Sequence, residues 1–404
     1  MKFRNIISYC ILFISFVGYA FAQQTNQFKR ADQVQLNTIT TAVPFLQITP
    51  DSRSGALGDA GVALSPDANS THSNPSKLAF IEEDMGVSLS YSPWLRNLVP
   101  DINLSYVSFF KRIDNRSAIG ASLRYFSLGK ITFTNDQAQA IGDFNPNEFG
   151  IDFTYASKLS DYFSIGVTGR FINSNLTQGQ AESNPGRAVA ADVSAFYESD
   201  RFRLGDYNAV ARAGANISNI GSKISYTETS DADFIPINMR LGAGLTLDLD
   251  DYNQLTFLFD VNKLLVPTPP IYQLNEDGGL VIDSEGNPVI EKGEDPNRGI
   301  ASGMFGSFND APGGSAEEFR ELNYSVGLEY WYDQQFAVRL GYFYEHPTKG
   351  ARQFFTAGLG LRLNVIGIDL AYLVGNAQRN PLANTVRLSL LINFDDLTKP
   401  NTNN

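Results

Sequence analysis

Between residues 86 and 394, most of this chain consists of short runs in which apolar and polar residues alternate. A period of two is typical of a β-strand whose two faces meet different surroundings. In one run, Phe149, Ile151 and Phe153 occupy every second position. Fourteen runs of about ten residues follow this pattern, at 86–92, 102–112, 116–128, 147–158, 162–174, 187–198, 207–218, 235–248, 253–263, 322–332, 336–346, 353–363, 366–375 and 384–394.

The length and number of these runs predict a membrane barrel. About ten residues is the length at which a tilted β-strand crosses a bilayer, and an even number of strands allows an antiparallel barrel to close. A soluble β-protein is the alternative, but its polar faces are usually rich in Lys, Glu and Thr. Here the polar positions hold mainly Gly, Ala, Ser and Asn, with isolated Arg or Asp. We therefore predict an all-β fold, a fourteen-stranded antiparallel transmembrane β-barrel.

The connections between the runs favour the membrane barrel over the soluble alternative. Every second connection is short, as at Asp114-Asn115 and Ser160-Asp161, and the intervening ones are longer. Short periplasmic turns opposite long extracellular loops are typical of outer-membrane barrels. Aromatic residues flank the short turns, as an interfacial girdle does: Tyr162, Tyr252, Tyr330, Trp331, Tyr332 and Phe336.

The N-terminus reads as a secretory signal peptide. Lys2 and Arg4 precede an apolar run at 6–17, and Ala20-Phe21-Ala22 fits a cleavage site. Because Cys10, the one cysteine, lies inside this peptide, we expect no disulfide and no cysteine metal site. The predicted divisions are a signal peptide at 1–22, a mobile arm at 23–44, a hatch segment at 45–85, a barrel at 86–394 and a tail at 395–404.

The segment from 45 to 80 lacks the alternation and is dense in Gly, Asp, Asn, Ser and Pro. This composition suits a compact segment with many tight turns. Both ends of an even-stranded barrel lie on the periplasmic side, so the segment can enter the lumen as a hatch or plug. Its expected hatch residues are Asp51, Arg53, Gly55, Gly58, Asp59, Gly61, Asn74 and Pro75, with Asp51, Arg53, Asp59, Asp67 and Lys77 pairing with lumen charges.

Charged residues recur at the positions predicted to face the lumen. Buried charges persist only when they are paired or hydrated. Two interpretations remain: charge ladders that hold a hydrated lumen and clamp the hatch, or an electrostatic path for a solute. The residues are Arg124, Asp152, Arg170, Asp192, Arg212, Arg240, Asp260, Glu329, Arg339, Arg362, Asp369 and Arg387.

The connection at 264–321 is far longer than ordinary loops, which rarely exceed about fifteen residues without function or disorder. Its apolar, glycine-rich tip contains Met304, Phe305 and Phe308. An exposed apolar tip contacts a partner or folds over the mouth, although simple disorder is an equal alternative. Trp94 and Leu95, in the first long loop, extend the same candidate partner surface.

The sequence offers little for catalysis or nucleic-acid binding. The net charge of −12 opposes non-specific nucleic-acid binding. A Ser/His/Asp hydrolase would need His72 or His346, and neither stands in a convincing arrangement. The stretch Asp283 to Asn287 lacks the spacing of a calcium loop. We expect no catalytic, cofactor-binding or metal-binding site.

Two resemblances to known families appear in the hatch segment. Residues 74–79, Asn-Pro-Ser-Lys-Leu-Ala, resemble the Asn-Pro-Ala-Gly-Leu hatch motif of FadL-type outer-membrane transporters of hydrophobic compounds, with Ser76 and Lys77 as departures. Residues 50–63, PDSRSGALGDAGVA, followed by SPDANS at 65–70, are similar to the leader of the PorV family of the type IX secretion system. PorQ-type proteins share part of this segment and remain a competitor.

The PorV resemblance implies a non-enzymatic outer-membrane shuttle, surrounded by outer-membrane lipid. Such a protein binds the C-terminal signal domain of cargo at the giant translocon barrel and passes it to the sortase-like peptidase of the attachment complex. The loops at 93–101, 129–146 and 264–321 would carry these contacts. The FadL resemblance implies the alternative, a channel for hydrophobic small molecules.

Overall fold

The computed structural model describes residues 37–94, 101–134, 137, 139–176, 184–227, 232–277, 279–374 and 385–394. The predicted signal peptide, the arm up to residue 36, Leu95 and the tail at 395–404 lie outside these residues. From Thr38 onward the described residues belong to one unit. None of the described helices is long and apolar enough to span a membrane.

The predicted barrel is confirmed. One sheet holds 15 strands, and the three-residue β9 (Phe202–Leu204) only extends the end of β10, so fourteen strands form the barrel wall. Antiparallel pairing of β1 with β19 and of β10 with β11 closes it. The wall consists of β1 (Met85–Pro93), β2 (Ile102–Arg112), β3 (Ser117–Leu128), β6 (Asn147–Lys158), β7 (Phe163–Asn175), β8 (Gly186–Glu198), β10 (Tyr207–Gly221), β11 (Asn238–Asp248), β12 (Asn253–Leu264), β15 (Asn323–Tyr332), β16 (Phe336–Tyr344), β17 (Gln353–Leu363), β18 (Ile366–Val374) and β19 (Val386–Asn393).

Each strand presents alternate residues to the two sides of the wall. In β18, exposed and buried positions alternate without a break. Outward side chains such as Phe153 and Val189 are 68% and 63% exposed, whereas the inward Asp192 is fully buried. An apolar outer face is the surface that lipid requires, and the inner face must satisfy its polar groups within the lumen.

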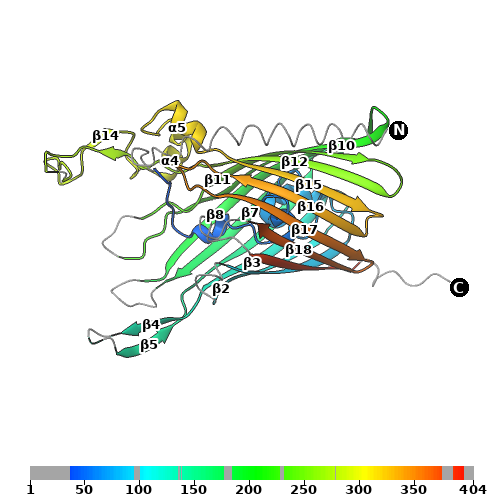
Figure 1. The fold of residues 1–404 in the computed structure, drawn as a ribbon, viewed down its shortest axis with the longest axis horizontal. Helices are drawn as coiled ribbons and strands as arrows, with labels where there is room; N and C mark the ends of the chain where they lie inside the picture. Colours follow the sequence, from blue (N-terminus) through cyan, green and yellow to red (C-terminus); the bar gives the residue numbers. More distant parts are fainter. Residues whose placement is uncertain are drawn as a thin grey trace. The chain divides into compact units, whose positions relative to one another are not determined.

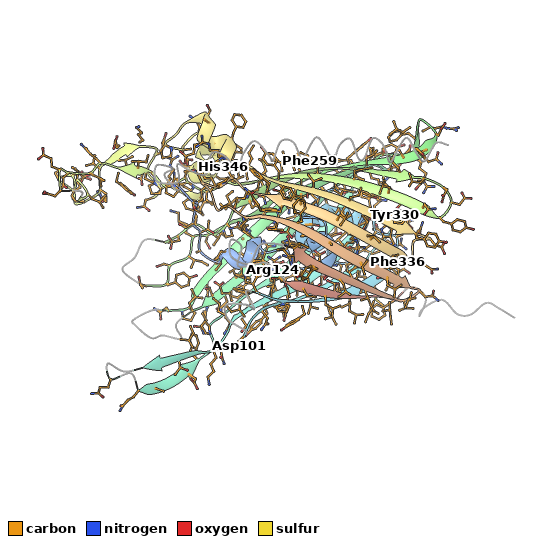
Figure 2. All side chains as sticks on the ribbon, viewed as in Figure 1. Asp101, Arg124, Phe259, Tyr330, Phe336 and His346 are labelled. Atoms are coloured by element: carbon orange, nitrogen blue, oxygen red, sulfur yellow. The ribbon has the colours of Figure 1, made fainter. Side chains whose placement is uncertain are left out.

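The two ends of the barrel differ as the sequence predicted. The strands run obliquely side by side between the two ends (Figure 1). Tyr330 and Phe336 lie toward the end with the short turns, and Asp101 and His346 toward the end with the long loops (Figure 2). The β15–β16 turn holds three residues between the paired Tyr332 and Phe336. Asp333 and Gln334 have φ of 51° and 52°, the left-handed conformation of a primed hairpin turn, and the backbone N–H of Gln335 donates to the carbonyl of Tyr332.

Two of the long connections contain secondary structure of their own. The connection at 129–146 forms a hairpin of β4 (Ile131–Thr134) and β5 (Ala140–Phe144). The insertion at 264–321 holds β13 (Ile271–Tyr272), β14 (Ile290–Lys292), α4 (Ile300–Gly306) and α5 (Ser315–Arg320). The helices of this insertion lie beside the loop end of the barrel (Figure 1).

The hatch segment folds into four short helical pieces: η3 (Pro44–Gln47), α2 (Ser52–Gly55), α3 (Ser70–Ser73) and η4 (Pro75–Phe80). Asp51 and Asn74 start two of them, because their side-chain oxygens accept from Ser54 N and Ser76 N. Most of the hatch is buried, and Ala42 and Val43 join the same apolar cluster as Phe45 and Leu46. The buried part thus begins inside the stretch that we predicted to be a mobile arm.

Candidate functional site in the lumen and at the mouth

A chain of buried ion pairs joins the hatch to the barrel wall. Arg53 of the hatch donates from Nη2 and Nε to the two carboxylate oxygens of Glu329 on β15, at 2.8 and 2.9 Å. Its Nη1 reaches Asp67 of the hatch at 3.0 Å. Burial alone would lower the pKa of Arg53, but the Glu329 carboxylate outweighs it and raises that pKa. A bidentate pair of this kind fixes orientation as well as position.

The same network continues around the wall. Arg339 on β16, fully buried, donates to Glu329 and to Asp369, each at 2.7 Å. Arg362 on β17 holds the other oxygen of Asp369 at 2.7 Å. The carboxylates of Glu329 and Asp369 therefore each face two guanidinium groups. Four of the predicted lumen charges meet here, and they clamp the hatch through Arg53.

A second network lies on the opposite part of the wall. Arg170 on β7 pairs with Asp152 on β6 at 2.6 Å and with Asp192 on β8 at 2.9 Å. Ser122 also donates to Asp152, and the backbone N–H of Asn219 donates to Asp192. These contacts join neighbouring wall strands and do not include a hatch residue, so their role is to satisfy charges within the lumen.

Three further contacts hold the hatch from other directions. Arg387 on β19 pairs with Asp59 at 2.9 Å. Asp260 on β12 accepts from the backbone N–H groups of Gly61 and Val62 at 2.7 and 3.0 Å. Asn74 donates to the carbonyl of Ala195 on β8 at 3.0 Å. The hatch is thus fastened to strands all around the barrel.

Glycine at position 58 permits a close approach of hatch and wall. Gly58 has a φ of 68°, and a Cβ there would lie 2.6 Å from the backbone of Tyr342 on β16. A side chain would therefore meet both backbone strain and a clash that cannot be relieved by rotation. Gly55 lies against the flexible side chain of Arg387, and Pro75 starts η4.

The remaining predicted lumen charges are less completely paired. Arg124 on β3 is buried, donates to the carbonyl of Leu46 at 2.7 Å and contacts His72 Nδ1. Burial, assisted by Arg124, lowers the pKa of His72, so that ring is neutral. Arg212 pairs with Glu198. Arg240, half-buried, lines a cavity of about 30 Å³ with Asp59 and Asp260.

The expected pairing of three hatch charges with the lumen wall is wrong. Asp67 pairs with Arg53 inside the hatch, and Asp51 caps the α2 helix. Lys77 donates to the carbonyl of Gly61 at 2.6 Å and to Ser73 Oγ at 2.8 Å. Burial lowers the pKa of Lys77 to about 8. These groups hold the hatch's own fold, because a compact loop offers nearer partners than the wall does.

At the end of the barrel with the long loops, called the mouth below, an ion-pair cluster anchors the long insertion. Lys263 at the end of β12 pairs with Glu318 at 3.0 Å and Glu321 at 2.6 Å. Lys349 in the β16–β17 loop pairs with Glu317 at 2.6 Å and Glu321 at 3.0 Å. Glu317 and Glu318 lie on α5 and Glu321 caps its C-terminus, so the two lysines fasten the insertion at its C-terminal end. No sequence pattern predicts this cluster, because its two lysines are distant in the chain from its three glutamates.

The candidate partner residues divide into two groups. Phe305 on α4 and Phe308 just after it are 71% and 48% exposed. Met304 packs against the main apolar cluster, and Trp94 packs against both that cluster and a second one at Phe343. The predicted apolar tip therefore offers its two phenylalanines, while Met304 and Trp94 are largely engaged by the barrel.

Two clefts open at the mouth, on either side of residues 38–44. One, of about 250 Å³, is lined by groups that include Ile39, Ile48, Leu264, Lys349 and Arg352. The other, of about 380 Å³, is lined by Val43, Phe126, Leu128, Glu148, Tyr226 and others. Below the first cleft lies the 30 Å³ cavity beside Arg240, room for about one water molecule. Among the described residues, no group of His, Cys, Asp or Glu is arranged to hold a metal ion.

These features define a class: an outer-membrane β-barrel whose lumen is filled by an ion-paired N-terminal hatch. Comparison with known protein families then identifies the family within this class to which the chain belongs. Residues 30–271, more than half of the chain and including the whole hatch, match the family model described as type IX secretion system protein PorV. The chain belongs to the PorV family and is an outer-membrane component of that secretion system.

The solved structures to which this chain is similar are distant in sequence. The toluene transporter TodX of Pseudomonas putida is 11% identical, with a TM-score of 0.47 over 85% of this chain and 98% of its own. The Ralstonia pickettii toluene transporter TbuX is 13% identical, with a TM-score of 0.42 over 85% and 96%. A Pseudomonas aeruginosa FadL homologue is 12% identical, with a TM-score of 0.43 over 89% and 100%. A search of curated proteins finds no match.

Proposed function

We propose that this protein is a non-enzymatic shuttle of the type IX secretion system. It binds the C-terminal signal domain of cargo as the cargo leaves the giant translocon barrel, and it passes the cargo to the sortase-like peptidase of the attachment complex. The observation that carries the proposal is the PorV family match over residues 30–271, which includes the hatch.

The geometry of the lumen supports a binding role over conduction. Arg53 and Glu329 clamp the hatch to the wall, and the cavity beneath the mouth has a volume of about 30 Å³. A folded protein domain must therefore be handled at the surface of the barrel. The extracellular mouth offers clefts of about 250 and 380 Å³ and two exposed phenylalanines on an anchored insertion.

The alternative, a FadL-like channel for hydrophobic small molecules, draws on the Asn-Pro hatch motif and the strand number. It requires an apolar passage beside the hatch. The apolar wall residues that face the hatch, such as Phe110 and Phe196, are instead packed against it. Other hatch contacts are made by charged groups, Asp260 and Arg387 among them. Packed apolar groups leave a solute little room and charged groups bind it poorly, so the shuttle is the better-supported function.

A deletion strain tests the proposal. Cargo proteins carrying the C-terminal signal should accumulate in the periplasm without this gene, and the wild-type gene should restore their export. Pull-down of the tagged chain from solubilised outer membranes should recover a very large barrel and cargo. Normal secretion in the deletion strain would overturn the proposal.

Two variants locate the contact. Phe305→Asp with Phe308→Asp places charge on the exposed apolar face at α4 and should reduce recovery of the translocon or cargo at least tenfold. Phe319→Asp is the matched control, because Phe319 is 72% exposed on α5 of the same insertion. Equal recovery with all variants would exclude the tip as the contact while leaving the shuttle role to the deletion test.

A further inference from the structure

One of the two clefts at the mouth contains a buried carboxylate. This cleft, of about 380 Å³, is lined by residues 40–44 and by residues at the loop-side ends of β3 and β6. Glu148, the second residue of β6, faces inward in phase with Asp152 and is 3% exposed, whereas Asp233 is exposed. Among the described residues that line the cleft, none is Lys, Arg or His. The lining is therefore negatively charged, and we call this site the acidic cleft.

Glu148 differs from the neighbouring buried carboxylates of the wall in its partners. Asp152 and Asp192 share the guanidinium group of Arg170. In the part of the chain that the structure describes, Glu148 has no ion-pair partner, and its Oε1 accepts a hydrogen bond from Ser174 Oγ at 2.6 Å. A buried carboxylate without a counter-charge is costly, so this position favours a cation that reaches it through the acidic cleft.

Hydroxyl groups beside Glu148 provide further hydrogen-bond acceptors. Ser174 donates to Glu148, and Tyr226 Oη donates to Ser174 Oγ at 3.0 Å. Both hydroxyl hydrogens thus point toward the carboxylate, and the Tyr226 oxygen retains acceptor lone pairs. Thr41 Oγ1, in the same cleft, is buried and has no hydrogen-bond partner among the described residues. A ligand group with several N–H donors therefore finds several oxygens within one small site.

Neighbouring residues hold Tyr226 and Asp233 in position. The carbonyl of Tyr226 accepts from the backbone N–H of Asn184 at 2.8 Å, and its ring lies against Gly186, where a Cβ would come within 2.9 Å of a ring carbon. Asp233 exchanges two backbone hydrogen bonds with Ile224, at 2.7 and 2.9 Å. These groups are in place before a ligand arrives, which lowers the entropic cost of binding.

The walls of the acidic cleft are apolar. Phe126 and Leu128 line it from β3, and residues 42–44 line it from the N-terminal segment. Lys and Arg carry a charged group on a long aliphatic stem, and they lay that stem along apolar surface. An apolar cleft that contains an isolated carboxylate matches both the shape and the charge of such a side chain. A calcium ion would require more oxygen ligands than this one buried carboxylate supplies.

We infer that the acidic cleft binds a lysine or arginine side chain of a polypeptide held at the mouth. The cationic group donates to Glu148 and to the oxygens of Tyr226 and Thr41, and the aliphatic stem lies along the apolar walls. The inference rests on the proposed function for the identity of the polypeptide, which is the signal domain of cargo. Water at the carboxylate is the competing explanation, and it predicts no preference for a cationic side chain.

Two small probes test the site itself. The purified protein in detergent micelles is titrated with Nα-acetyl-lysine amide and with Nα-acetyl-norleucine amide, which has a similar aliphatic stem but no ammonium group. The lysine probe should bind about tenfold more tightly, because a charge-assisted hydrogen bond in a partly buried site has that magnitude. Glu148→Gln should remove this preference, and Asp251→Asn, in the exposed β11–β12 turn, should retain it. Equal affinity of the two probes for the wild-type protein overturns the inference.

Recovery of cargo tests the source of the side chain. Tagged Glu148→Gln should recover cargo from solubilised outer membranes about tenfold less well than the wild type, with recovery of the very large barrel unchanged, and Glu148→Asp, which keeps the charge, should recover more cargo than Glu148→Gln. Retained heat-modifiable mobility shows that each variant is folded. Equal cargo recovery by Glu148→Gln overturns the assignment to cargo. Failure of the wild-type chain to recover any cargo overturns the shuttle instead, and the two probes still decide whether the cleft binds a cationic side chain.

Discussion

Glu329 connects the hatch to the wall, and its replacement tests whether that connection stabilises the barrel. The carboxylate accepts three charge-assisted hydrogen bonds, two from Arg53 and one from Arg339. Glu329→Gln keeps the shape but removes the charge. Both guanidinium groups stay buried, each with one remaining carboxylate partner, Asp67 or Asp369.

Breaking a buried ion pair on one side usually costs about 3–5 kcal/mol. Since Asp67 and Asp369 still compensate the two arginines, we expect the lower end, about 3 kcal/mol, in the free energy of unfolding. The exposed pair of Arg112 with Asp84 is the control, and Asp84→Asn should cost under about 1 kcal/mol.

Denaturant titration in detergent micelles measures this difference. Trp331 reports on the site, because its ring lies 5.3 Å from the Arg339 guanidinium. A double-mutant cycle with Arg53→Gln should give a coupling of about 1–3 kcal/mol. If Glu329→Gln behaves like Asp84→Asn and the coupling is near zero, the ion pair does not secure the hatch and the reasoning is wrong.

Three further predictions concern single sites. Gly58→Ala should destabilise the barrel by more than about 1 kcal/mol, because it combines positive φ with a backbone clash, whereas Gly205→Ala, in open space, should cost about 1 kcal/mol or less in the same titration. Burial, with smaller contributions from nearby glutamates, raises the pKa of Asp310 to about 6. The insertion should therefore be most firmly closed below about pH 4 and loosen as the pH rises through about 6, and Asp310→Asn should remove this dependence in limited proteolysis. Lys263→Met should increase cleavage within 264–321 at least tenfold, and an unchanged digest would show that the cluster does not anchor it.

The barrel was predictable because alternation is a local signal. Most strands begin and end within about two residues of the predicted runs, since the transition from alternation to turn residues marks them. The exceptions have local causes. β10 extends to Gly221 through a register shift between Ile217 and Ile220, and β11 starts at Asn238, just beyond Pro236, which lacks a backbone donor.

The site was predictable only in part. The alternation of residues along each strand identified which charges face the lumen, but it could not show which of them form ion pairs with one another. Whether Arg53 meets Glu329 or Asp260 depends on the stagger of strands hundreds of positions away, which no local pattern records. The ion-pair cluster around Glu321 was not predictable for the same reason. The partial burial of Trp94 depends on how the loop folds back onto the barrel.

The distance along the chain between the hatch and its partners has a consequence for assembly. Arg53 and Glu329 are 276 residues apart, and Ser52 and Ser389 are 337 apart. The hatch is synthesised first, yet these contacts can form only after β15 and β19 have been synthesised. Closing loops of that length is slow and entropically unfavourable. Because β19 both pairs with β1 and holds Ser389, closure of the barrel and this hatch contact depend on the same strand, so a barrel that stalls before closure also leaves the contact unmade.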